Sequence, residues 1–322
     1  MELSINKTAE FLKENDNYLI LTHRRPDGDA HGSASALCEG LRRLGKTAYI
    51  FKNEETTARY VKYVEPYWAD ENYMPETILT VDLASESLFP IGAESFFGKT
   101  DLAIDHHPSN SGYAEDICLN GTRASCGEII YEVLVELGIE IEKTIAEPMY
   151  VAVSTDTGCF AFANTTDNTF WVASKLAATG ISIRDLNRDL FRTKTRRRFE
   201  LEGMIMSGIE FYYGGKVSVI TITKEMMDKT GCTENDMDDI AAMPGSIESV
   251  LCGITLREMK STTDCKVSVR TGPEINSNAL CAHLGGGGHA MASGASPKGM
   301  TVYEMKKVLL DALKEYFPDE EM

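Results

Sequence analysis

The feature that most constrains the fold is an alternation of short apolar runs with helical patterns in the first half of the chain. The runs YLILTH, KTAYIF, TILTVDL and LAIDHH read as short buried strands. After the first run, apolar residues from Ala30 to Leu44 keep a 4-3-4-3 spacing, and Gly45 is suited to end that helix. A further helix is predicted over SCGEIIYEVLVELG. This alternation predicts an α/β fold with a doubly wound, mostly parallel sheet.

The alternating sequence pattern ends near Ile181, where a long, locally basic and helical segment begins. Beyond it, IEFYYGGKVSVITI reads as a β-hairpin that turns at Gly214 and Gly215. Two more strand patterns, a glycine run and a closing helix follow, which is typical of a smaller α+β domain. We therefore predict a first domain over residues 1–185, a helical linker over 186–210 and a second domain over 211–322.

Charge and cysteine usage exclude several classes of function. The 322-residue chain carries a net charge of −17, and such a surface repels long duplex nucleic acid, whose binding needs many basic contacts. None of the eight cysteines forms a C-x-x-C pair, which argues against a zinc ribbon or a dithiol redox site. We see no signal peptide and no apolar window near 18 residues, and we expect a cytoplasmic protein without a membrane partner.

Acidic and histidine side chains gather where the predicted strands end. They are His23, Asp27 and Asp29 after the first run, Asp82 in LTVDLAS, Asp105, His106 and His107 after LAI, and Asp156 in VAVSTDTG, which also reads as a strand. Parallel strand ends lie side by side, so these groups are expected to converge on one pocket. Clustered carboxylates repel each other unless a cation joins them, and oxygen and imidazole ligands suit Mn²⁺ or Mg²⁺.

Each part of this pattern has a plainer reading when it is taken alone. An isolated Asp27-Gly28-Asp29 is more often a turn that caps a helix, and its spacing also resembles the start of a calcium loop. The twelfth position of such a loop is Cys38 instead of glutamate, which excludes the calcium reading. Adjacent histidines are more often core or surface residues than ligands. Only the combination in one chain favours a metal site.

The same residues carry a resemblance to a known family. HRRPDGDAHGS, VDLAS, AIDHHPSN and STDTGCFAFANTT resemble, in order, the four motifs of the DHH phosphoesterase family, which is named for the triplet Asp105-His106-His107. The ending CKVSVRTG…ALCAHLGGGGHAMASGA resembles the DHHA1 domain of the first subfamily. Within the family, the length and the ending are most similar to the bifunctional oligoribonuclease (nanoRNase)/pAp phosphatases. The resemblance implies a DHH domain joined by the helical linker to a DHHA1 domain.

The resemblance also implies two divalent cations, with Mn²⁺ favoured and Mg²⁺ or Co²⁺ as alternatives. The implied ligands are His23, Asp27 and Asp82 for one cation, and Asp29, Asp82, His106 and Asp156 for the other. Asp82 would bridge the two cations as part of the catalytic set. Asp105 is expected to lie behind the site and orient its neighbours, while His107 faces the substrate phosphate.

Substrate contacts are expected mainly from the second domain. The glycine run is not a P-loop, because no Lys-Ser/Thr pair follows it, and its use would be close backbone approach to an anion. The resemblance makes it a phosphate-binding loop of Gly286, Gly287, Gly288 and His289, with Arg270 as a guanidinium clamp. Arg123 and Ser125 precede a predicted helix and offer a weaker anion contact, for which an ordinary helix cap is an equal alternative.

These residues favour a two-metal phosphoesterase that hydrolyses short single-stranded oligoribonucleotides to nucleoside monophosphates and pAp to AMP. Alternatives are a phosphodiesterase for cyclic di-AMP or linear pApA and, less favoured, a non-catalytic nucleotide-binding regulator. Two departures from the family pattern bear on substrate preference: His31 stands where an apolar residue is usual, and Cys126-Gly127 interrupts a stretch that is often Thr or Ser. A homodimer is left open.

Overall fold

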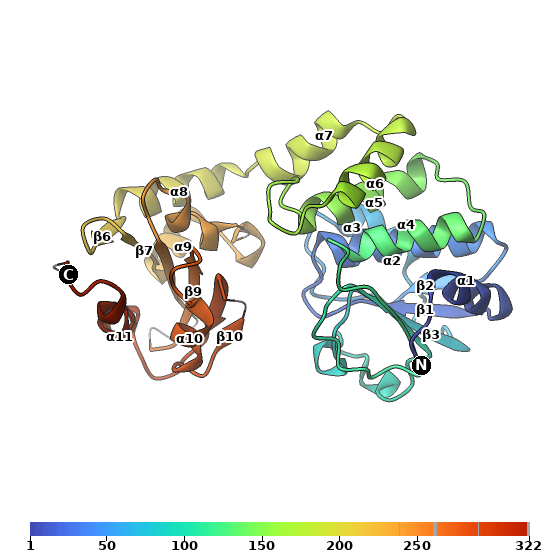
Figure 1. The fold of residues 1–322 in the computed structure, drawn as a ribbon, viewed down its shortest axis with the longest axis horizontal. Coiled ribbons are helices and arrows are strands. Elements are labelled where there is room, and N and C mark those ends of the chain that lie inside the picture. The colour runs from blue at the N-terminus through green and yellow to red at the C-terminus, as the bar shows by residue number, and fades with distance from the viewer. Residues whose placement is uncertain (238, 260–262, 289, 321–322) are drawn as a thin grey trace. The chain divides into compact units, whose positions relative to one another are not determined.

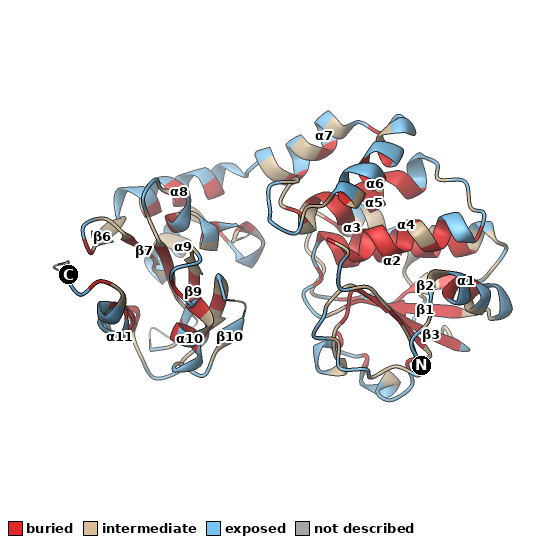
Figure 2. Cartoon of the chain, viewed as in Figure 1, coloured by how far each residue is buried: buried red, intermediate tan, exposed pale blue. Residues whose placement is uncertain are grey.

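A computed structural model describes residues 1–237, 239–259, 263–288 and 290–320. The chain forms two compact units, Met1–Thr193 and Lys194–Met322, and each is described by itself. Each unit has its own sheet and its own buried apolar core (Figures 1 and 2). No helix among the described residues combines the length and the apolar character needed to cross a bilayer.

The first unit is built on a five-stranded sheet in the order β2-β1-β3-β4-β5, in which every neighbouring pair is parallel. Its strands are β1 (Tyr18–Leu21), β2 (Ala48–Ile50), β3 (Thr77–Val81), β4 (Leu102–Asp105) and β5 (Asp116–Leu119). The first four follow the apolar runs singled out in the sequence, whereas β5 was not expected. The doubly wound, mostly parallel sheet is thus confirmed, and the carboxyl ends of its strands share one edge.

The helices of this unit share the main apolar core with one face of the sheet, whereas loops and 3-10 turns cover the other face, and one pair of helices packs closely. The helices are α1 (Ile5–Glu14), α2 (Gly28–Arg43), α3 (Val61–Val64), α4 (Cys126–Glu136), α5 (Lys143–Asp156), α6 (Asp167–Ala178) and α7 (Ile183–Asn187). Helix α2 is buried along most of its length (Figure 2). A Cβ atom at Gly32 would lie 2.2 Å from the carbonyl oxygen of Pro148, so α2 and α5 approach through a glycine.

Asp156 lies at the end of α5, and its prediction at the end of a strand is wrong. The run YVAVS that precedes it is apolar and β-branched, which reads as a buried strand when periodicity is the only guide. Helix α5 is buried on almost all sides from Ile145 to Ser154, so it shows no polar face that would reveal a helical period. The site therefore combines strand ends with a helix end.

The second unit is built on a mixed six-stranded sheet in the order β10-β11-β9-β8-β7-β6. Its strands are β6 (Glu210–Tyr212), β7 (Val217–Ile222), β8 (Cys252–Glu258), β9 (Cys265–Thr271), β10 (Gly287–Gly288) and β11 (Ala292–Ala295), and its helices are α8 (Arg196–Ser207), α9 (Lys224–Thr230), α10 (Ser277–Ala282) and α11 (Val302–Leu313). The hairpin at Gly214 and Gly215 is confirmed, because β6 and β7 pair antiparallel around two glycines with positive φ. The smaller α+β architecture is also confirmed.

The helical segment near the boundary of the units is broken instead of continuous. Helix α7 passes into a single π-helical turn at Arg188–Arg192, and α8 starts only at Arg196. The basic side chains of α8 have acidic partners: Arg196 pairs with Glu200, and Arg198 with Glu202. These acidic partners offset the positive charge at the start of α8. The linker boundaries drawn from the sequence stay a prediction.

Candidate metal centre

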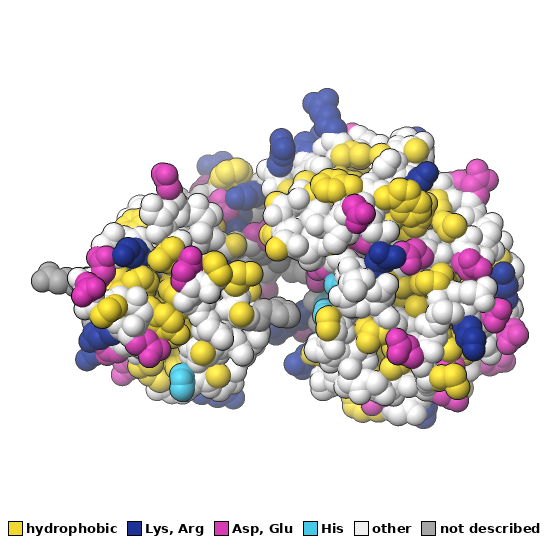
Figure 3. Space-filling view, viewed as in Figure 1, with side chains coloured by type: hydrophobic (Ala, Val, Ile, Leu, Met, Phe, Trp, Pro, Cys, Tyr) yellow, Lys and Arg dark blue, Asp and Glu magenta, His cyan; other side chains and the backbone are white. Residues whose placement is uncertain are grey.

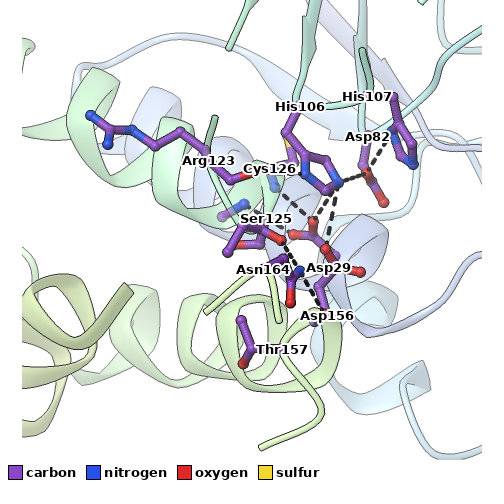
Figure 4. Close-up of polar contacts among 12 residues, drawn as sticks. Asp29, Asp82, His106, His107, Arg123, Ser125, Cys126, Asp156, Thr157 and Asn164 are labelled. Carbon is purple, nitrogen blue, oxygen red and sulfur yellow. Dashed lines mark hydrogen bonds and ion pairs between the residues drawn. The ribbon is translucent and has the colours of Figure 1, made fainter. Parts of the chain in front are cut away.

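The first unit brings the predicted acidic and histidine side chains into three adjoining groups. Figure 4 shows the part of this cluster in which His106 lies between Asp29, Asp82 and Asp156. The groups are His23, Asp27 and Asp82; Asp29, His106 and Asp156; and Asp82, His106 and His107. Within each group, one potential ligand atom from every residue lies within 4.8 Å of the others. Asp82 and His106 each belong to two groups, so the three groups form one continuous centre. Its members come from the ends of β1, β3 and β4, the start of α2 and the end of α5.

Asp82 lies at the middle of the centre in a strained backbone conformation. It directly follows β3 and has a φ of 53°, a region that residues other than glycine rarely adopt. Its Oδ1 atom is buried and accepts no hydrogen bond from the described residues, although His106 Nε2 lies 3.4 Å and His107 Nδ1 3.6 Å away. A buried carboxylate oxygen without a partner costs free energy. A cation at this position would remove that cost, so the donor set fits a metal.

Asp29 is buried and is held by the start of α4. Its Oδ2 atom accepts a hydrogen bond from the Cys126 amide at 2.6 Å, and its Oδ1 atom accepts from the Gly127 amide at 3.0 Å and from Ser33 Oγ at 2.9 Å. Burial and the neighbouring carboxylate of Asp82 nevertheless raise the pKa of Asp29 well above its ordinary value. The sequence did not predict that the start of α4 holds Asp29. The departure from the family pattern at Cys126-Gly127 lies at the position of the two donating amides.

His106 lies among three carboxylates and is oriented by a backbone carbonyl. Its Nε2 atom is 3.7 Å from Asp29, 3.4 Å from Asp82 and 3.6 Å from Asp156, while Nδ1 donates to the Arg123 carbonyl oxygen at 3.2 Å. Burial lowers the pKa of His106, but the three carboxylates outweigh it and raise that pKa to about 10. Burial and the nearby Asp82 raise the pKa of Asp156 to about 7, against the opposing effect of His106. The centre therefore contains more acidic groups than it can ionise without an added positive charge.

His107 is oriented by the buried carboxylate of Asp105. Asp105 Oδ1 accepts from His107 Nδ1 at 2.8 Å and from the His106 and His107 amides, and Oδ2 accepts from Asn110 Nδ2 at 2.7 Å. Burial raises the pKa of Asp105, but these hydrogen bonds outweigh it and lower that pKa, while the bond to Asp105 raises the pKa of His107. Asp105 belongs to none of the three groups of potential ligands among the described residues.

The loop between β1 and α2 supplies the remaining two side chains of the centre, those of His23 and Asp27. His23 donates from Nδ1 to the Arg24 carbonyl oxygen at 2.8 Å, which turns Nε2 toward Asp27 at 3.9 Å and Asp82 at 3.8 Å. Asp27 also caps α2, because its Oδ1 atom accepts from the amides of Asp29 and Ala30. The cap reading and the ligand reading of Asp27 are therefore compatible, since one carboxylate can serve both.

The two weaker anion contacts have structural partners. Ser125 is buried and caps α4, with its Oγ atom accepting from the Glu128 amide at 3.3 Å. The Arg123 guanidinium pairs with Glu132 at 2.6 Å and points away from the carboxylates (Figure 4). Only the backbone carbonyl of Arg123 reaches the centre, through His106. A role of these two side chains in substrate binding stays a prediction.

The predicted substrate residues that the structure describes in the second unit lie on or directly beside β9 and β10, which are separated by β11. Arg270 on β9 is opposite Ala292 on β11, and β11 pairs in turn with β10, which contains Gly287 and Gly288. A Cβ atom at Gly286 would lie 2.2 Å from the Gly294 carbonyl oxygen, so close backbone packing already requires that glycine. Burial lowers the pKa of Arg270. His289 lies outside the described residues.

His31 is buried behind the centre without a hydrogen-bond partner for either ring nitrogen among the described residues. Only 2% of its surface is exposed, and its ring packs at 5.5 Å from that of Tyr60. Burial and the nearby His23 lower the pKa of His31 to about 3. It therefore fills the position as an uncharged side chain, as the apolar residue expected there would.

Comparisons with known proteins agree with this architecture. Residues 17–153 match the DHH family, N-terminal domain, and residues 214–319 match the DHHA1 domain. The chain is 30% identical over 311 residues to the bifunctional oligoribonuclease and PAP phosphatase NrnA of Thermus thermophilus, covering 95% of this chain and 92% of that protein. It is 29% identical over 294 residues to the protein of the same name from Bacillus subtilis, covering 87% and 89%.

One solved structure is similar over nearly the whole chain. The crystal structure of an exopolyphosphatase-related protein from Bacteroides fragilis has a TM-score of 0.88 and 24% sequence identity, covering 98% of this chain and 96% of that one. This likeness concerns the fold. The two matched domains and the identity to the Thermus protein confirm the resemblance found in the sequence motifs. The chain belongs to the DHH family, with a C-terminal DHHA1 domain.

Proposed function

We propose that the protein is a two-metal-dependent phosphoesterase that hydrolyses short oligoribonucleotides to nucleoside monophosphates and pAp to AMP. The observation that carries this proposal is the pair of groups His23-Asp27-Asp82 and Asp29-His106-Asp156, which adjoin at Asp82. The names of the relatives from Thermus and Bacillus, which cover most of this chain, support the substrate class.

Asp82 would bridge two divalent cations, one held with His23 and Asp27 and the other with Asp29, His106 and Asp156. When bound, such cations supply Lewis acidity, lower the pKa of a water molecule and neutralise charge that builds on phosphoryl oxygens. The ligand atoms are carboxylate oxygens and imidazole nitrogens without a thiolate, which favours Mn²⁺ and admits Mg²⁺ or Co²⁺. The protein residues supply the fixed geometry, since Asp29 and His106 are each held by backbone groups.

His107 would act on the substrate. Its Nδ1 proton is bonded to Asp105, and this bond favours the protonated imidazole, which leaves Nε2–H to donate to a phosphoryl oxygen or to the departing oxygen. The side chain is 40% exposed, so a substrate can reach it. Asp105 is then a positioning residue, and Asp82 and His107 lie at the reacting phosphate.

The second unit would bind the nucleotide end. Arg270 on β9 and the backbone amides of Gly286, Gly287 and Gly288, at the neighbouring strands β11 and β10, would hold a terminal phosphate or base, together with His289. A clamp of this kind favours short substrates, because one end and the scissile phosphate must be held at once. Arg123 and Ser125 would contribute to anion binding only as part of the N-terminus of α4, which Ser125 caps.

The test uses the full-length protein with Mn²⁺, Mg²⁺ or Co²⁺ and four substrates: pAp, pApA, RNAs of two to twenty nucleotides, and cyclic di-AMP. We expect mononucleotide release from pAp and the shortest RNAs. The Asp82→Asn variant should lose that release, whereas Asp101→Asn, a carboxylate variant at the opposite end of β4, should keep it. Preferential hydrolysis of cyclic di-AMP would favour the alternative phosphodiesterase, and binding without hydrolysis of any substrate would favour a nucleotide-binding regulator.

A further inference from the structure

Exposed aromatic side chains lie on the first unit just beyond the last carboxylate of the metal centre. Phe162, Phe170 and Trp171 are 59%, 57% and 48% exposed, and they come from the loop after α5 and the first turns of α6. Hydrophobic side chains are visible over α6 in the space-filling view (Figure 3). Large exposed rings that gather in one place mark a binding surface more often than scattered ones do.

The Phe162 ring is held in place by the backbone on which it lies. Gly158 has a φ of 55°, and a Cβ atom there would lie 2.4 Å from the ring atoms Cε1 and Cζ of Phe162. In the same loop, Asn164 Nδ2 donates to the carbonyl oxygens of Asp156 and Ala124, each at 3.1 Å. The loop is thereby fastened to the end of α5 that carries Asp156, so an exposed ring is fixed beside the metal centre.

Phe170, near the start of α6, is a second exposed ring of this region. Its ring stacks on that of Phe160, with centroids 5.5 Å apart and an interplanar angle of 22°, and Phe160 packs in turn against the buried Tyr150. Exposed aromatic faces are elements with which proteins bind single-stranded nucleic acid without reading its sequence.

Hydrolysis of pAp and hydrolysis of pApA differ in whether a base is attached on the phosphoryl side of the scissile bond. In pAp and in pApA, hydrolysis forms a bond from the water oxygen to phosphorus and breaks the bond to the 3′-oxygen, which departs as the 3′-hydroxyl of pA. The phosphoryl group leaves as inorganic phosphate from pAp and as a second pA from pApA. The departing pA is common to both reactions, and only pApA carries a nucleoside on the phosphoryl side.

We propose that the exposed face of Phe162 stacks on the base of the nucleoside attached to the phosphoryl side of the scissile bond, with Phe170 available to the next base of a longer RNA. This inference rests on the proposed function. The departing pA is assigned to the clamp in the second unit, and the phosphoryl-side base has an aromatic surface in the unit that bears the metal ligands. The aromatic surface thus adds to the affinity for oligonucleotides but not to that for pAp, which has no base on the phosphoryl side.

The test compares Phe162→Ala, Phe162→Tyr and the unaltered protein on three substrates: pApA, the same dinucleotide with an abasic second residue, and pAp. Phe162→Ala should raise KM for pApA on the order of tenfold with little change in kcat, and Phe162→Tyr should restore it. In the unaltered protein, loss of the second base should raise KM similarly, and in Phe162→Ala it should have no further effect. Phe97→Ala, 48% exposed in the same unit, is the matched control and should leave all three KM values unchanged.

Several outcomes would overturn the inference while leaving the proposed function intact. The first is an unchanged KM for pApA in Phe162→Ala, and the second is an equal rise in KM for pApA and for pAp in that variant. The third is a sedimentation coefficient of Phe162→Ala that differs from that of the unaltered protein, while the ratio of the KM for pApA to the KM for pAp stays unchanged. The last outcome would assign the aromatic surface to contact with a second copy of the chain. If the unaltered protein hydrolysed none of the three substrates, the proposed function itself would fall, and with it the inference.

Discussion

The His107 ring is held by a 2.8 Å hydrogen bond from Nδ1 to Oδ1 of Asp105, the residue that ends β4. The same carboxylate accepts from two backbone amides and from Asn110, and it is fully buried. The first letter of the DHH triplet is therefore a support, while His106 and His107 face the centre. A buried acceptor with this many donors fixes both the ring orientation and its proton.

Replacing this support should slow hydrolysis without removing the metals. We expect Asp105→Asn to lower kcat for pAp about 10- to 100-fold, because an amide cannot stabilise the protonated His107 ring as the carboxylate does. Metal content by elemental analysis should match that of the unaltered protein, and Asp101→Asn should keep full kcat. Loss of bound metal in Asp105→Asn would contradict the supporting role and make Asp105 a ligand.

Metal binding should stabilise the first unit through Asp82. At a free Mn²⁺ concentration 100 times the dissociation constant, linkage adds about 2.7 kcal/mol to the free energy of unfolding, so chelation should lower Tm. Asp82→Asn should lose this dependence on Mn²⁺, and asparagine tolerates the positive φ at this position. Differential scanning fluorimetry with and without Mn²⁺ measures the effect. An Mn²⁺-dependent Tm that persists in Asp82→Asn would exclude Asp82 as a bridging ligand.

The contact between α2 and α5 should tolerate no side chain at Gly32. Gly32→Ala places a methyl group 2.2 Å from the Pro148 carbonyl oxygen, and relieving that overlap should cost about 1–3 kcal/mol of unfolding free energy. Gly203→Ala on α8 is the control, since no atom lies within 4 Å of its added Cβ and a helical alanine should stabilise by about 0.5–1 kcal/mol. Urea unfolding followed by circular dichroism compares the two, and equal effects would contradict this packing.

The second unit should lose stability in acid through Asp236. Burial raises the pKa of this carboxyl, but bonds from Arg197 and from Thr195 and Thr233 outweigh it and lower the pKa to about 2. A folded-state pKa below the unfolded value of 3.8 gives stability that is present above about pH 4 and lost as the pH falls toward 2.

We expect Asp236→Asn to be less stable than the unaltered protein by about 1–2 kcal/mol at pH 6. Its free energy of unfolding should also change less between pH 5 and pH 3, because the titrating group is gone. Urea titrations at the three pH values, with unfolding of the second unit followed by amide hydrogen exchange, give both quantities. An equal pH dependence in the two proteins would rule out Asp236 as the source.

Much of the fold and the centre could be predicted because local patterns report them. The apolar runs marked β1 to β4, and the helical pattern after the first run indicated a parallel sheet, although only 3-10 turns connect β3 to β4. Because parallel strands end at one edge, Asp82 and His106 could be placed together from residues that lie 24 positions apart. Asp156 joined the same prediction for a partly wrong reason, since its buried helix carries no polar face that periodicity could detect.

The sequence by itself determined which side chains could form the centre, because strand ends and helix caps are encoded within a few residues. Tertiary structure decided how those side chains are held. Asp29 meets the amides of Cys126 and Gly127, nearly a hundred residues away, and the close packing of α2 on α5 brings Asp156 into one group with Asp29. Such contacts depend on the distance between packed elements, which no local spacing in the chain records.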